Sequence, residues 1–74
     1  MIKLGQKVRF NPLHYLPGGG GELKNLVTGT VTYVNEPHRY FTASYESGGR
    51  MWAISFNFYD LVGVCERGIV KIIN

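Results

Sequence analysis

Residues 29–56 read GTVTYVNEPHRYFTASYESGGRMWAISF, and their alternation of large apolar and polar side chains indicates β-strands with one apolar face. β-Branched and aromatic residues dominate this stretch, as is typical of strands. The diglycine at 48–49 suits a two-residue hairpin turn, and residues 36–38 are expected to form the earlier connection. The stretch therefore predicts three consecutive antiparallel strands. They span 26–35, 39–47 and 50–57.

Apolar side chains must gather on one face of these strands, and this requirement fixes the register because a slip of one residue reverses both faces. The three-residue connection pairs Tyr33 with Phe41, and the diglycine turn pairs Tyr45 with Trp52. Both turns then select the same apolar face, and Tyr40 is left outside. Burial of Trp52 predicts that Trp52→Ala costs about 3–5 kcal/mol of stability. The rings assigned to the core are Tyr33, Phe41, Tyr45, Trp52 and Phe56.

The rest of the chain is expected to cover the apolar face of this three-stranded unit. Further strands are predicted over 6–11, 62–65 and 69–73, with a long first loop before residue 26 and one short helical turn at 58–61. Their alternating apolar side chains would close the sheet on itself. The fold prediction is a single all-β domain over residues 1–74, a small closed barrel of five to six antiparallel strands.

Composition limits the class of protein. With 74 residues, 45% hydrophobic and 18% charged, the chain has the apolar content of one globular domain and too little charge for a disordered one. No segment approaches the roughly 20 apolar residues of a membrane span. Cys65 is the single cysteine, so no intrachain disulfide can form, and small secreted domains usually depend on several. We therefore predict a cytoplasmic protein.

The order of elements resembles the SH3-like small β-barrels. The resemblance rests on the strand KVRF, the long first loop, the meander, the helical turn and the last strand, and it covers nearly the whole chain. The segment GTVTYVNEPHRYFTASYE begins with Gly-x-Val, and in this it resembles the start of KOW-type barrels. It also resembles short proteins of bacterial mobile elements and phages. Members of this fold bind peptides, nucleic acids or proteins, so the resemblance alone does not choose among partners.

Catalytic, metal and cofactor sites are not expected. The tetraglycine at 18–21 lacks the following Lys-Ser or Lys-Thr and the helix of a phosphate-binding loop. His14 and Tyr15 lie in the long first loop, where a histidine without clustered ligands is weak evidence for a metal. Packing over the end of the barrel and contact with a partner both remain open for these two side chains.

A binding edge is the remaining candidate site. His38, Arg39 and Tyr40 lie at the tip of the first hairpin and Arg50 follows the diglycine turn. Arginine and tyrosine are residues that interfaces favour. A structural role is the alternative, in which Arg39 covers the rim with its aliphatic stem.

Two functions follow from these residues. The first is a non-enzymatic module that binds a protein partner. The resemblance to phage proteins implies, more specifically, a small inhibitor of a host enzyme. The alternative is nucleic-acid binding, with Tyr40 stacking on a base. A monomer or a weak homodimer is expected in either case. The cations of the alternative are Arg9, Arg39, Arg50 and Lys71.

Overall fold

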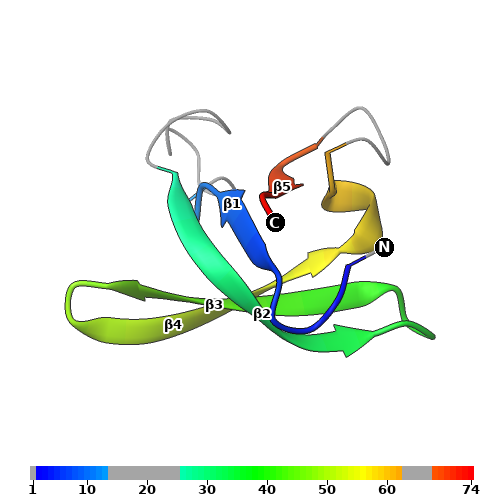
Figure 1. The fold of residues 1–74 in the computed structure, drawn as a ribbon, viewed down its shortest axis with the longest axis horizontal. Coiled ribbons are helices and arrows are strands. Elements are labelled where there is room, and N and C mark those ends of the chain that lie inside the picture. The colour runs from blue at the N-terminus through cyan, green and yellow to red at the C-terminus, as the bar shows by residue number, and fades with distance from the viewer. Residues whose placement is uncertain (1, 14–25, 63–67) are drawn as a thin grey trace.

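The computed structural model describes residues 2–13, 26–62 and 68–74, which form one antiparallel sheet in the order β4-β3-β2-β1-β5 (Figure 1). In the described residues one 3-10 turn, η1 (Phe58–Asp60), follows β4. The all-β prediction is confirmed. Within these residues the structure contains no helix of the length and hydrophobicity that a bilayer crossing requires. The strands are β1 (Lys7–Phe10), β2 (Val27–Asn35), β3 (Tyr40–Ser47), β4 (Arg50–Asn57) and β5 (Val70–Ile72).

The sheet is strongly curved but open, and the closed barrel expected from the sequence is not formed by the described strands (Figure 1). β4 and β5 are its two edges. Where closure was expected, the chain after η1 meets β5 through one parallel bridge between Leu61 and Val70, with the Val62 N–H donating to the Val70 carbonyl at 2.9 Å. β5 has only three residues, and they pair with β1 and, at Val70, with Leu61, so no ladder joins β5 to β4. The predicted strand at 62–65 extends beyond the described residues.

The second hairpin has the predicted register. Gly48 and Gly49 both have positive φ, 63° and 76°, as a two-residue turn between twisted strands requires. Tyr45 pairs with Trp52, and the ladder continues in step to the far end of both strands. A two-residue turn that glycine forms without strain therefore fixes the register of eight consecutive residue pairs.

The first hairpin differs from the prediction. A β-bulge lies between Val31 and Tyr33, so the ladder shifts by one residue and the connection has four residues instead of three. Tyr33 therefore pairs with Thr42 and is 47% exposed, whereas Val34 takes the expected place of Tyr33 opposite Phe41. The inward assignment of Tyr33 was wrong. The bulged register packs the small aliphatic side chain of Val34, partly buried, against the core and leaves the phenol group of Tyr33 in water, where its hydroxyl needs no buried partner.

Trp52 was also expected in the core and is not buried. It lies on the core-facing side of β4 opposite Tyr45, but 49% of it is exposed because the sheet extends past the core near the diglycine turn. Its indole N–H donates to the Ser47 carbonyl at 3.1 Å. Tyr45 is half-buried and packs edge-on against Phe10, with ring centroids 5.5 Å apart.

The core is made of rings and aliphatic side chains from every strand. Phe10 packs against Phe56 at 5.0 Å between centroids, and Phe41 packs against Phe56 at 5.6 Å. Gly29 lets the Phe10 ring approach the backbone of β2 closely. The buried apolar residues are Ile2, Val8, Phe10, Val31, Phe41, Ala43, Phe56, Phe58, Leu61, Ile69 and Val70.

Candidate functional site

The turn that joins β2 to β3 holds the residues that the sequence selected. Arg39 ends the turn with a φ of 58°, a left-handed conformation that is unusual for a residue with a side chain. Its N–H donates to the Glu36 carbonyl at 3.1 Å, and the His38 N–H donates to Asn35 Oδ1 at the same distance. The tip is therefore an ordered turn in which each of these backbone amides has a partner.

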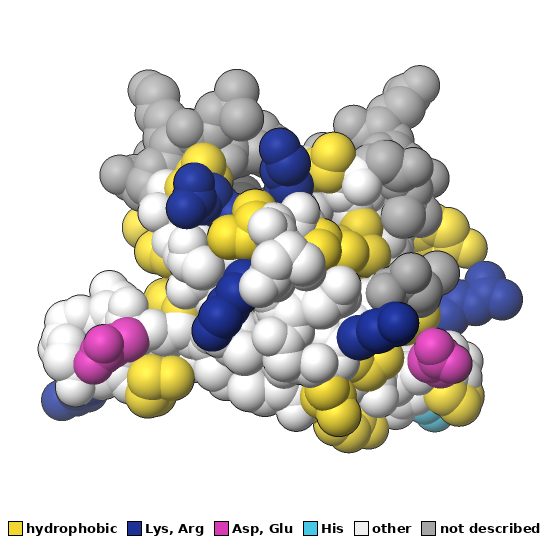
Figure 2. All heavy atoms as spheres, viewed as in Figure 1, with side chains coloured by type: hydrophobic (Ala, Val, Ile, Leu, Met, Phe, Trp, Pro, Cys, Tyr) yellow, Lys and Arg dark blue, Asp and Glu magenta, His cyan; other side chains and the backbone are white. Residues whose placement is uncertain are grey.

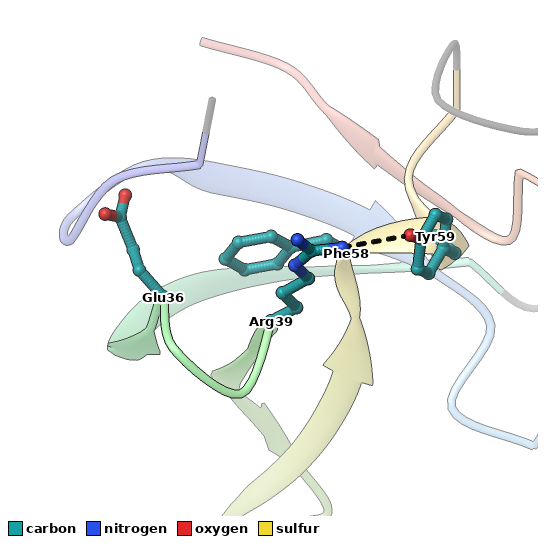
Figure 3. Close-up of a pocket in the computed structure, with 4 residues that line it drawn as sticks. All are labelled: Glu36, Arg39, Phe58 and Tyr59. Atoms are coloured by element: carbon teal, nitrogen blue, oxygen red, sulfur yellow. Dashed lines mark hydrogen bonds between the residues drawn. The ribbon is translucent and has the colours of Figure 1, made fainter.

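The 3-10 turn η1 packs beside this tip and fixes Arg39 from the other side. The Phe58 N–H donates to the Arg39 carbonyl at 2.9 Å, and Arg39 Nη1 donates to the Tyr59 hydroxyl at 3.3 Å (Figure 3). Asp60 accepts a hydrogen bond from the Asn57 N–H at 2.9 Å, which closes η1. Backbone and side chain of Arg39 thus both contact a segment about 20 residues further along the chain.

An open cleft of about 380 Å³ lies between the turn and η1. Figure 3 shows Arg39 extending along it between Glu36 and Tyr59, with the Phe58 ring behind. Phe58 is buried, whereas Tyr59 is 56% exposed. The cleft therefore offers a guanidinium, a phenol and a carboxylate over an apolar floor.

Two more tyrosines lie at the same end of the sheet. Tyr33 and Tyr40 are ring neighbours with centroids 5.8 Å apart, and Asn35 Nδ2 donates to the Tyr33 hydroxyl at 3.2 Å. Tyr40 is half-buried, as a ring beside another on an outer face should be. We refer to these side chains together as the hairpin-end surface. Its members are Tyr33, His38, Arg39, Tyr40 and Tyr59.

The structure brings some predicted residues together and separates others. His38, Arg39 and Tyr40 share the hairpin-end surface, but Arg50 pairs with Ser47 at the opposite end of β3. His14 and Tyr15 lie outside the described residues. Sequence reasoning missed Tyr33, which it placed in the core, and Tyr59, whose position depends on the packing of η1 against the turn.

Arg50 belongs to a second open cleft, of about 550 Å³, beside the diglycine turn. Leu13 and Trp52 give it an apolar character, and both are more than two-fifths exposed. The lining residues are Pro12, Leu13, Tyr45, Ser47, Gly48, Arg50 and Trp52.

Among residues 2–13, 26–62 and 68–74, no three His, Cys, Asp or Glu side chains gather as metal ligands would. No protein-family model, curated protein or solved structure matches the chain.

Proposed function

We propose that this chain is a non-enzymatic binding module of the SH3-like small-barrel class, and that its hairpin-end surface contacts a protein partner. The order of elements supports the fold assignment, since β1 lies between β2 and β5 and η1 precedes the last strand. The observation that carries the function is the group of three tyrosines at the end of the sheet that holds Arg39, of which Tyr33 and Tyr59 are exposed and Tyr40 is half-buried. Tyrosine and arginine, together with tryptophan, are enriched at the energetic centres of protein interfaces.

The geometry favours recognition because the side chains are held in place before a partner arrives. Arg39 is fixed by Tyr59, and Tyr33 is fixed by Asn35 and by the neighbouring Tyr40 ring. Rigid side chains lose less conformational entropy on binding than free ones. A partner would place a carboxylate near the guanidinium and apolar groups over the rings. In the cytoplasm of a phage-infected or element-carrying bacterium, such a partner is a host enzyme that the module occupies.

The test compares site variants with a matched control. Tagged wild type, Tyr40→Ala and Arg39→Glu are used to capture proteins from the organism that encodes the chain, and the captured protein is then purified and titrated. Met51→Ala is the control, because Met51 is 69% exposed near the opposite end of the sheet. Circular dichroism checks that each variant is folded.

If Arg39 and Tyr40 are interface hot spots, each substitution should remove about 2 kcal/mol of binding free energy. This loss weakens binding about 30-fold. The control should bind as the wild type does. Wild-type affinity in both site variants would refute the assignment, as would a loss confined to Met51→Ala.

A further inference from the structure

The outer face of β1 and β5 carries three exposed cations on adjacent strands. Lys7 and Arg9 are two residues apart on β1, so both point away from the core, whose side is taken by Val8 and Phe10. Lys71 is the exposed residue of β5 and lies directly opposite Arg9 in the ladder. Figure 2 shows dark blue side chains over the part of the molecule where β1, β2 and β5 lie.

Neighbouring hydroxyl groups position two of these three cations without neutralising them. Lys7 Nζ donates to Thr30 Oγ1 at 2.7 Å, and Arg9 Nη2 donates to Thr28 Oγ1 at 3.3 Å. Threonine carries no charge, so the positive charge of both groups remains. The basic face, as we call it, consists of Lys7, Arg9 and Lys71 with Thr28 and Thr30.

The acidic side chains of the described residues lie elsewhere. Glu36 is in the β2–β3 turn, Glu46 is near the diglycine turn opposite Met51, and Asp60 caps η1. The magenta side chains in Figure 2 accordingly lie at the two ends of the view. In the described part of the chain, the basic face therefore has no carboxylate on its own strands.

The Arg9–Lys71 pair has an energetic cost within the fold. Like charges directly opposite each other in an antiparallel ladder repel and destabilise the sheet. Nothing in the described packing requires either charge, because both side chains are exposed. An external anion would turn this repulsion into a favourable interaction.

We propose that the basic face binds the phosphate backbone of a nucleic-acid strand without reading its bases. Lys7 and Arg9 are two positions apart along β1, a rise of about 6.6 Å, which is comparable to the spacing of successive phosphates along one nucleic-acid strand. Lysine, arginine and threonine are typical phosphate contacts, and such contacts carry no sequence information. This site shares no residue with the hairpin-end surface, so it goes beyond the protein-binding function and can fail independently of it.

Fluorescence anisotropy of a labelled, mixed-sequence single-stranded oligonucleotide tests the site. Three phosphate contacts give a salt slope of about −2, so raising salt from about 50 to about 200 mM weakens binding about 20-fold. The double variant Arg9→Gln/Lys71→Gln keeps one contact, and its affinity should fall only about 3-fold over the same range. The control Lys3→Gln/Arg50→Gln removes the same charge from exposed positions outside the basic face and should keep the wild-type slope.

Several results would overturn the proposal. One is absence of wild-type binding at about 25 mM salt, and another is a control pair that loses as much of the slope as the basic-face pair. Binding to phosphatidylserine vesicles or to poly-glutamate in place of the oligonucleotide would assign the face to a membrane or an acidic protein.

The melting temperature tests separately whether Arg9 and Lys71 repel each other. Relief of the repulsion should raise the melting temperature of Arg9→Gln at low salt and have little effect at high salt, where the charges are screened. A lower melting temperature at low salt would mean that Arg9 stabilises the fold, and the argument for an external anion would fail.

Discussion

Replacement of Gly29 by alanine tests how closely β2 and the core are packed. An ideal Cβ at this position would lie 2.9 Å from the carbonyl oxygen of Ser44 and 3.0 Å from Cε1 of Phe10. Both distances are shorter than normal contacts to carbon. The Ser44 oxygen is backbone and the Phe10 ring is completely buried, so neither can move away without disturbing its neighbours.

The expected effect is the balance of two opposing contributions. Alanine in a strand interior is normally better than glycine by about 0.5–1 kcal/mol. Overpacking of a core costs about 1–3 kcal/mol. The net loss for Gly29→Ala is therefore about 1 kcal/mol, which lowers the melting temperature of a domain of this size by about 4–8 °C.

Thermal unfolding followed by circular dichroism measures this loss, and a double-mutant cycle identifies its cause. In a Phe10→Leu background one of the two close contacts is removed, so Gly29→Ala should cost less, by roughly 0.5 kcal/mol or more. A Gly29→Ala protein that melts at or above the wild-type temperature would refute the reasoning. A cost that is unchanged by Phe10→Leu would assign the clash to the Ser44 backbone alone.

Two further substitutions test the register and the turn. Trp52→Ala should cost about 2 kcal/mol in urea unfolding, roughly half of the 3–5 kcal/mol expected for the fully buried Phe41, because half of the indole is already exposed; equal losses for Trp52→Ala and Phe41→Ala would contradict this. Arg39→Gly should be about 1 kcal/mol more stable than Arg39→Ala, since only alanine retains the strain of a left-handed backbone and both lose the Tyr59 hydrogen bond. Equal unfolding free energies for the two would argue against the positive φ.

The sequence predicts the second hairpin well and the first one poorly, and the turns explain the difference. Gly48 and Gly49 define both the position and the length of their turn. The earlier turn ends in Arg39, a residue that gives no sign of a left-handed conformation. Tyr33 and Val34 are both compatible with a core position, so the apolar pattern is satisfied with or without a bulge. In the structure Val34 takes the place opposite Phe41.

The candidate site was predictable only where its residues are neighbours in sequence. His38, Arg39 and Tyr40 follow one another, and their selection required only a hairpin tip. Tyr59 joins them through a hydrogen bond across 20 residues, which no local pattern reports. The pairing of Arg9 with Lys71 likewise depends on β1 and β5 being adjacent, whereas the sequence shows only scattered cations.

The bulge at Thr32 affects the direction of the hairpin end but not which side chains the hairpin end exposes. Removing Thr32 would leave a regular ladder in which Val31 still faces Ala43 and Tyr33 still faces Thr42. An extra residue of this kind increases the local twist of a strand pair and changes the direction of the residues that follow it. Insertion or deletion of a single residue here would therefore turn the same recognition side chains towards a differently shaped partner. The core would keep its position.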